Sequence, residues 1–177
     1  SIYVNPTQFG PKEDFKNYPR DLKRDSSMIE KENVDILFIP SNNVIYPISY
    51  LTYIDVEKIS KPLCGQFRPG HFRGVATIVA KLLNIVQPNV MYLGQKDAQQ
   101  VAVLKAMVLD LNFPVSIKVV ETKREIDGLA MSSRNKYLSP AHRQEAVVLY
   151  QSLKQAKQAI KQGERNVKKI VSLIRSL

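Results

Sequence analysis

Cysteine and histidine are scarce in this sequence. Cys64 is its only cysteine, and His71 and His142 are its only histidines. A lone cysteine cannot form a disulfide within the chain, which favours a reducing compartment such as the cytoplasm. One cysteine and two histidines are also too few for the four ligands of a Cys/His zinc site. These counts exclude a disulfide-stabilised scaffold and a zinc domain of this type.

Long apolar runs and leader-like segments are absent as well. No stretch approaches the roughly 18 consecutive apolar residues of a membrane span, although the hydrophobic fraction of 44% is ordinary for a globular chain. Ser1 opens on the strand-like SIYVN without the regions of a signal peptide, and the chain ends inside the periodic NVKKIVSLIRSL. We expect a soluble protein without a membrane partner, and a fragment cut at both ends.

Positive charge is in excess. The net charge is +10, and residues 141–177 alone hold eight Lys or Arg against two Glu, a net +6. A basic balance raises nucleic acid as a partner. The lysines of this region alternate with apolar residues at helical spacing, which is typical of a solvated helix face, and no aromatic-rich β motif accompanies them. We expect no nucleic-acid partner, and a basic RNA-binding module stays the alternative.

Strand and helix patterns alternate along the first two thirds of the chain. Four short segments rich in β-branched residues have the composition of strands buried on both faces: residues 1–5, 34–40, 90–94 and 115–120. Apolar stripes at helical spacing occupy residues 71–87 and 97–112, before Pro88 and Pro114. Strand–helix–strand order predicts a parallel sheet. The predicted fold is therefore α/β, with a Rossmann-like parallel sheet flanked by helices.

The pattern changes after Glu121. A polar loop is followed by a predicted helix with Ser139 as N-cap and Pro140 at its first position, ended by Gly163. We place a domain boundary near residue 122. Residues 1–122 then form the Rossmann-like domain, and residues 123–177 form the start of a smaller C-terminal domain.

The segment after residues 90–94 is the first candidate ligand site. Ligands of parallel sheets bind beyond the carboxyl ends of strands, where helix N-termini attract anions. Gly94–Asp97 occupies such a strand end and the first turn of the next helix, and Lys96 can act as a point charge on phosphate. Asp97 and Gln100 also have the spacing of a capping box, an alternative reason for Asp97. A lysine beside the positive end of a helix is mildly unfavourable, and an anionic ligand would offset this cost.

Two other polar segments are candidates. Asn5 and Gln8 follow the first predicted strand, and their amides suit the hydroxyl and carboxylate groups of a small substrate, although Asn-Pro turns are also common. The segment IDGLAMSSRNKY contains Ser132, Ser133 and Arg134, which a tight turn does not require and an anionic ligand would. The glycine-rich CGQFRPGHFRG lacks the Lys and Ser or Thr of a phosphate loop, and no G-x-G-x-x-G occurs. It is predicted to be a turn before the helix at 71–87, with Arg68 and Arg73 as possible ligand contacts.

Four blocks of the sequence together resemble one enzyme family. VNPTQFGPKEDFKNYPRD, RPGHFRGVATIVAKLLNIVQP, YLGQKDAQQ and DGLAMSSRNKYLSPAHR closely resemble pantothenate synthetase, the pantoate–β-alanine ligase, in order and spacing. The resemblance covers nearly the whole chain. It implies a nucleotidyltransferase-type Rossmann domain, a smaller C-terminal domain and a homodimer. It also implies that ATP and Mg²⁺ adenylate (R)-pantoate, releasing pyrophosphate, and that β-alanine then attacks the pantoyl adenylate to give pantothenate and AMP.

The resemblance also implies roles for substrate-binding residues. Gln8 matches a glutamine that contacts pantoate and the β-alanine site, with Asn5 beside it, and Gln100 matches a pantoate contact. Gly94, Gln95, Lys96 and Asp97 match an ATP-binding GxKD segment, with Lys96 near the phosphates.

The loop in the second half matches another part of the family's site. Met131, Ser132, Ser133 and Arg134 match the counterpart of the KMSKS loop of class I aminoacyl-tRNA synthetases. Ser132, Ser133, Arg134 and Lys96 are therefore the expected catalytic group, because carboxylate adenylation depends on stabilising phosphate charge. Lys123 stands where the family usually has an apolar residue whose backbone contacts ATP.

One departure from the family is serious. No part of these 177 residues supplies the family's HxGH-type histidine segment, and the end of its C-terminal domain is missing as well. We expect the fragment alone to be weakly active or inactive, and no metal ligands are assigned. A different adenylating enzyme with a KMSKS-like loop is the second alternative.

Overall fold

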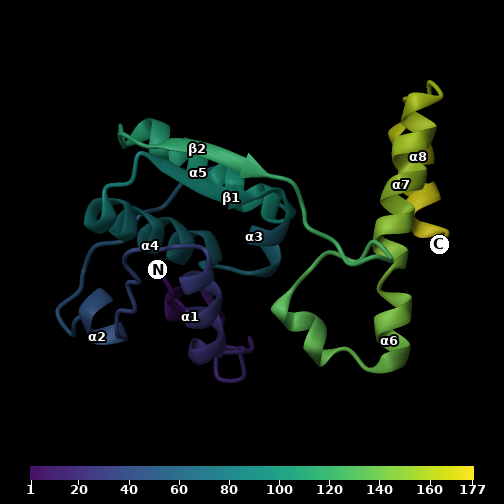
Figure 1. Cartoon of the computed structure of the whole chain (residues 1–177). Coiled ribbons are helices and arrows are strands. Elements are labelled where there is room, and N and C mark those ends of the chain that lie inside the picture. The colour runs from purple at the N-terminus through teal and green to yellow at the C-terminus, as the bar shows by residue number, and fades with distance from the viewer. The chain divides into compact units, whose positions relative to one another are not determined.

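The computed structural model of the chain describes residues 1–177, which fall into two compact units, Ser1–Glu121 and Thr122–Leu177 (Figure 1). The first unit contains η1 (Pro6–Gln8), α1 (Leu22–Lys31), α2 (Asn42–Ile45), α3 (Cys64–Phe67), α4 (His71–Val86), β1 (Val90–Gly94), η2 (Gln95–Asp97), α5 (Ala98–Asp110) and β2 (Ser116–Val120). The second unit contains η3 (Ser133–Tyr137), α6 (Pro140–Glu145), α7 (Val148–Lys161) and α8 (Val167–Arg175). No helix combines the length and the apolar character needed to cross a membrane.

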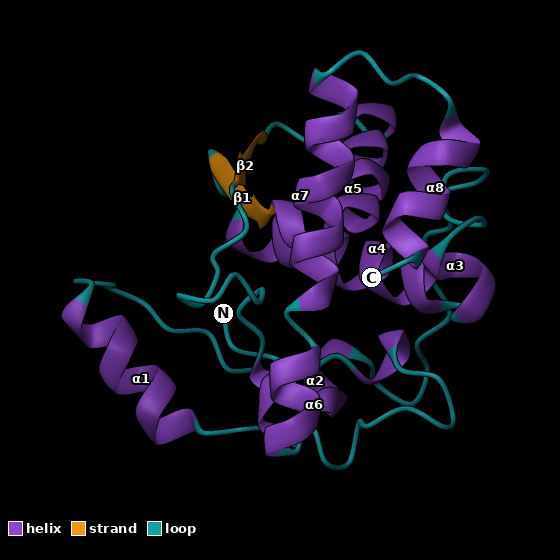
Figure 2. Cartoon of the chain, turned by 90° about the vertical axis from the view of Figure 1, so that its right-hand side faces the viewer, coloured by secondary structure: helices purple, strands orange, loops and turns teal.

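The sheet of the first unit is parallel and small. β1 and β2 pair in parallel, from Val90 opposite Ser116 to Gly94 opposite Val120 (Figure 2). α5 connects the two strands, because parallel neighbours require a crossover. The predicted strands at 90–94 and 115–120 and the mixed α/β class are confirmed.

The other two predicted strands are wrong. Residues 1–5 and 34–40 make one backbone hydrogen bond, in which the Ile2 N–H donates to the Phe38 carbonyl at 3.0 Å, and neither segment joins a sheet. Residues 1–4 and the end of the second segment, Ile39 and Pro40, instead line a hollow of about 570 Å³ together with Phe15 and Leu22. A strand requires a continuous ladder of hydrogen bonds to a neighbour, which the composition of a segment does not specify, and without that neighbour Val34, Ile36 and Ile39 lie exposed.

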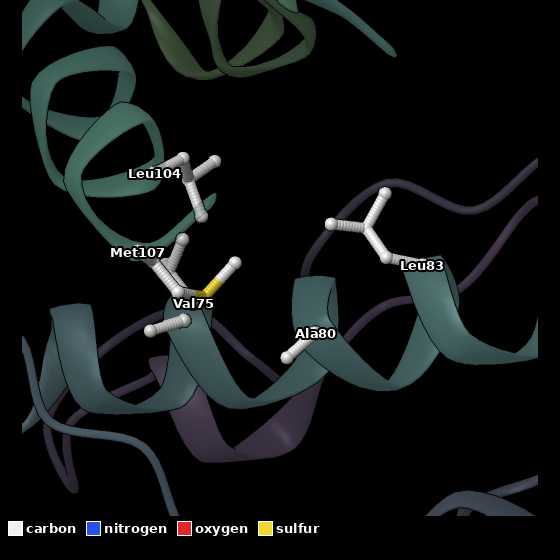
Figure 3. Packing of buried hydrophobic residues seen from close by; sticks show 6 residues of the cluster. Val75, Ala80, Leu83, Leu104 and Met107 are labelled. Carbon is white, nitrogen blue, oxygen red and sulfur yellow. The ribbon is translucent and has the colours of Figure 1, made fainter. Parts of the chain in front are cut away.

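The core of the first unit lies where α4 packs against α5. Val75, Ala80 and Leu83 of α4 face Leu104 and Met107 of α5 (Figure 3). Both helices were predicted from the apolar periodicity of the sequence, in which every third or fourth side chain lies on the same helix face, and both predictions are confirmed.

The second unit is helical, and its first predicted helix is divided. Ser139 caps α6 by accepting from the His142 N–H at 3.2 Å, and Pro140 occupies the first turn, as predicted. The continuous helix to Gly163 is wrong, since α6 ends at Glu145 and α7 begins at Val148. Hydrogen bonds around Val147 tighten to the i→i+3 type, and two consecutive β-branched residues, Val147 and Val148, favour such a break.

Candidate functional site

The Asn5–Gln8 turn is held from inside the first unit. Asn5 is 3% exposed, and its Nδ2 donates to Gln8 Oε1 at 3.2 Å and to the Gly74 carbonyl at 3.1 Å. Its Oδ1 accepts from the Tyr46 hydroxyl at 2.8 Å and from Thr7 Oγ1 at 3.0 Å. Burial raises the pKa of Tyr46, which keeps that hydroxyl protonated as a donor. The amide of Asn5 is thus used to position Gln8, whose Nε2 donors remain for a ligand.

Gly74 allows α4 to approach this turn closely. A Cβ at position 74 would lie 2.3 Å from the Thr7 carbonyl oxygen and 2.7 Å from the Gln8 nitrogen. Only glycine is compatible with this backbone contact. Sequence reasoning missed this residue, although a glycine inside an apolar helical pattern was an available signal.

A second group of side chains holds the same turn at its backbone. Arg68 donates from Nε to Glu13 Oε1 at 2.7 Å and from Nη2 to Glu13 Oε2 at 2.6 Å. Arg68 Nη1 also lies 3.1 Å from His71 Nε2, and His71 Nδ1 lies 2.8 Å from the Gln8 carbonyl oxygen. The hydrogen bond from Arg68 lowers the pKa of Glu13, and burial lowers the pKa of His71. Sequence reasoning found neither Glu13 nor the role of His71.

The two arginines considered as ligand contacts have partners in the protein. Arg68 is engaged by Glu13, and Arg73 pairs with Asp55 at 3.3 Å while its guanidinium lies 4.3 Å from the centre of the Tyr53 ring. These contacts explain both arginines without a ligand.

The Gly94–Asp97 segment is exposed at the carboxyl end of β1. Gly94 ends the strand, a Cβ there would meet nothing within 4 Å, and η2 follows at once. The capping box is wrong: Asp97 precedes α5 without a side-chain capping bond, because the 3₁₀ turn gives it ψ 57° instead of the extended conformation of an N-cap. The side chains of Lys96 and Asp97 remain open to solvent and to a ligand.

Two neighbouring glutamines of α5 differ in their use. Gln99 accepts from the Cys64 N–H at 3.0 Å and donates to the carbonyls of Ile59 and Pro62 at 3.0 and 2.8 Å. Gln100 is half-buried in the same turn and carries none of these bonds.

Asp97 is near enough to His71 for its charge to favour the protonated imidazole. The Gln8 turn contacts α4 through His71, and α4 packs against α5, whose first turn follows the strand-end segment.

The serine–arginine loop of the second unit begins at a hairpin. Arg124 pairs with Ala130 in an antiparallel bridge, and Gly128 turns the chain with φ 99°. The Met131 N–H donates to the Lys123 carbonyl at 2.9 Å, so this carbonyl is used within the hairpin. The Lys123 side chain is exposed.

The loop itself is capped by its first serine. Ser132 Oγ accepts from the Arg134 N–H at 3.3 Å, which starts η3, and Asn135 Nδ2 donates to the Ala130 carbonyl at 3.1 Å. Ser133 and Arg134 lie exposed on this short turn, beside Met131, which is 47% exposed. Hydroxyl and guanidinium donors on one turn can bind an anion.

Comparison with known proteins places the chain in a family. The sequence model described as pantoate-beta-alanine ligase matches residues 1–176. Pantothenate synthetase of Acetivibrio thermocellus is 60% identical over 170 residues, covering 96% of this chain and 60% of the relative. That of Thermotoga petrophila is 58% identical over 170 residues, covering 96% of this chain and 61% of the relative.

Solved structures agree with this result. The crystal structure of pantothenate synthetase from Thermus thermophilus superposes with a TM-score of 0.96 at 46% identity, covering 99% of this chain and 63% of that one. The Francisella tularensis pantoate-beta-alanine ligase, complexed with beta-gamma ATP and beta-alanine, has a TM-score of 0.77 at 38% identity and covers 99% and 65%. This chain thus spans about 60% of the length of the first relatives. The chain belongs to the pantoate-beta-alanine ligase family.

Proposed function

We propose that the protein to which this chain belongs condenses (R)-pantoate with β-alanine at the expense of ATP. A pantoate carboxylate oxygen attacks the α-phosphorus of ATP and pyrophosphate leaves. The β-alanine amine then attacks the acyl carbon and AMP leaves, giving pantothenate. The observation that carries this proposal is the family match over residues 1–176.

We infer that the β1–α5–β2 unit is part of a Rossmann-like nucleotidyltransferase sheet. In this proposal residues 1–122 bind nucleotide and pantoate, and residues 123–177 begin the C-terminal domain with the KMSKS-like loop. The parallel pairing of β1 and β2 and the exposed segment after β1 support this reading, because ligands of such sheets bind beyond strand carboxyl ends.

Pantoate is assigned to Gln8 and Gln100. The Asn5 bond to Gln8 Oε1 leaves the Gln8 Nε2 donors for the carboxylate or a hydroxyl of the substrate. Asn5 itself, buried and fully hydrogen-bonded, then acts by holding Gln8. Because the pantoate carboxylate is already ionised at neutral pH, adenylation requires no general base.

ATP is assigned to two segments: Gly94, Gln95, Lys96 and Asp97, and Met131, Ser132, Ser133 and Arg134, with a backbone contact from Lys123. The complex of the Francisella tularensis relative with beta-gamma ATP supports ATP as the nucleotide. Charge grows on the α-phosphate and the pyrophosphate during adenylation, and Lys96 and Arg134 would stabilise it. Gly128 would let the loop close over ATP and protect the acyl adenylate from water.

Mg²⁺, a homodimer and a cytoplasmic location are also part of the proposal. Mg²⁺ enters only as the ion that accompanies ATP, and no three His, Cys, Asp or Glu side chains gather at one place in the chain. A homodimer is proposed from the family resemblance, and a cytoplasmic location from the single cysteine. Since the chain spans about 60% of its first relatives, we expect the isolated chain to be weakly active or inactive.

Calorimetric titration of the 177-residue chain, with ATP and then with (R)-pantoate, tests the substrate assignment. We expect both to bind. Binding of ATP alone would indicate a different adenylating enzyme, which ATP–pyrophosphate exchange with a panel of carboxylates would identify. Binding of RNA that weakens steeply with salt, without any response to pantoate, would indicate the nucleic-acid module. The absence of heat from both small ligands, in the chain and in the complete protein that contains it, would refute the proposal.

A further inference from the structure

Two donors meet at the backbone carbonyl of Gln8. His71 Nδ1 lies 2.8 Å from this oxygen and Arg68 Nη2 lies 3.4 Å from it. The chemistry of adenylation uses neither Glu13 nor this carbonyl. The carbonyl belongs, however, to the residue whose side chain is assigned to pantoate.

The direction of these hydrogen bonds follows from the chemistry of arginine. A guanidinium has only donors, so His71 Nε2 must accept from Arg68 Nη1 at 3.1 Å. His71 is then neutral with its proton on Nδ1, and this Nδ1–H donates to the Gln8 carbonyl. The opposite tautomer would direct two lone pairs at each other across 2.8 Å.

Glu13 fixes the orientation of Arg68. Its two carboxylate oxygens accept from Nε and Nη2 at 2.7 and 2.6 Å, a bidentate geometry that holds the plane of the guanidinium. Both side chains are about a quarter exposed, at 24% for Glu13 and 27% for Arg68. Without Glu13, Arg68 can rotate away, and the Gln8 carbonyl alone is left to hold His71 in the Nδ1–H tautomer.

The environment of His71 supports a neutral ring. His71 is 8% exposed, and burial is the main cause that lowers the pKa of its imidazole. The charged groups that face it are Arg68, Glu13 and Asp97. Arg68 opposes the cation, whereas Glu13 and Asp97 favour it.

We propose that Glu13 is a positioning residue for pantoate binding: it holds Arg68, which holds His71 as the Nδ1–H tautomer, which in turn holds the backbone of Gln8. The proposal rests on the role of Gln8 in pantoate binding given above. Asn5 positions the Gln8 side chain at Oε1, so the residue is held at both its backbone and its amide. Gln8 is thereby pre-organised before pantoate arrives.

The tautomer can be measured without any substrate. The 177-residue chain has only two histidines, so long-range ¹H–¹⁵N spectra of this chain, labelled with ¹⁵N, resolve His71 and use His142 as an internal control. We expect His71 to be protonated at Nδ1 in the wild type and to gain a measurable Nε2–H population in Glu13→Ala, because one of its two restraining contacts is lost, with His142 unchanged. An Nε2–H form in the wild type, or an identical His71 spectrum in the variant, would overturn the proposal.

Pantoate affinity provides the second readout. In Glu13→Ala the Kd for pantoate should rise about tenfold, as expected for one disrupted hydrogen-bond network, while the Kd for ATP stays within about twofold. Asp55→Ala is the matched control, because it removes the carboxylate partner of another arginine, Arg73 on α4, and does not touch Gln8. His71→Asn, which keeps a donor near the position of Nδ1, should bind pantoate more tightly than His71→Leu.

The outcomes separate this proposal from the proposed function. Wild-type binding of pantoate with an unchanged Kd in Glu13→Ala would overturn the positioning role and leave the function intact. A parallel loss of ATP and pantoate affinity would show that Glu13 acts only on general stability, which also overturns it. Failure of the wild type to bind pantoate would count against the function, whereas the spectra would still decide whether Glu13 sets the tautomer.

Discussion

Replacing Gly74 by alanine tests the contact between α4 and the Gln8 turn. The added Cβ would lie 2.3 Å from the Thr7 oxygen, 2.5 Å from the Thr7 carbonyl carbon and 2.7 Å from the Gln8 nitrogen. All three are backbone atoms, so no flexible side chain can move aside. Either α4 or the turn must shift, and the bond from Asn5 Nδ2 to the Gly74 carbonyl, at 3.1 Å, is the first to be lost.

The magnitude follows from opposing effects on the free energy of unfolding. Alanine in place of glycine within a helix gains about 1 kcal/mol from propensity. Overpacking of a close contact costs about 1–3 kcal/mol, and leaving the buried Asn5 donor unsatisfied costs about 1–3 kcal/mol more. Gly74→Ala should therefore destabilise the protein, by about 1–5 kcal/mol, and weaken pantoate binding.

Urea denaturation followed by circular dichroism measures this effect. Gly10→Ala is the matched control, because its Cβ would meet its nearest neighbour, the Glu13 side chain, at an ordinary 3.7 Å. The control should stay within about 0.5 kcal/mol of the wild type. If Gly74→Ala were instead more stable by about 1 kcal/mol, propensity alone would govern this site and the reasoning would be refuted.

Further predictions concern charge, pH and capping. Lys96→Ala or Arg134→Ala in a complete enzyme should slow pantoate-dependent pyrophosphate release on the order of 10²-fold or more. Lys105→Ala, on the exposed side of α5, is the control and should not slow it. Near-normal release from the first two variants would contradict their role. Because burial lowers the pKa of His71, the unfolded chain binds this proton more readily. The stabilisation by the neutral ring is therefore complete above the ordinary histidine pKa of 6.5 and is lost as the pH falls below it. The free energy of unfolding should therefore decline on acidification. The decline should be smaller in His71→Asn, which lacks this titrating ring. An equal decline in both would exclude this cause. Ser139→Ala should cost about 1 kcal/mol in urea denaturation, because the capping bond of α6 is lost, and no change would show that the bond is not formed in solution.

Local patterns in the sequence were sufficient for several elements. The α4 and α5 helices follow from apolar periodicity, and Ser139 with Pro140 marks the start of α6. β1 and β2 are adjacent along the chain apart from α5, so their parallel pairing follows from strand–helix–strand order. Each of these features depends on residues within one or two turns, or on one short connection.

Other local patterns were misleading because tertiary contacts decided the outcome. Residues 1–5 and 34–40 have strand composition but lack a ladder of backbone partners. Asp97 and Gln100 have the spacing of a capping box, yet the 3₁₀ turn before α5 gives Asp97 the wrong backbone angles. Composition and spacing describe which secondary structure or cap a segment could form. Neither specifies the partner strand or the backbone conformation that this structure requires.

The sequence by itself determined the family and the α4 and α5 helices, and it singled out the polar segments proposed for pantoate and ATP, because these are properties of contiguous residues. Only the tertiary structure decided that Asn5 holds Gln8, that Gly74 must lack a side chain, and that Glu13 reaches His71 through Arg68. These partners are separated by up to 69 residues. The bonds of Asn5 to the Gly74 carbonyl and of Glu13 to Arg68 join segments 69 and 55 residues apart, so no local pattern in the chain could reveal them.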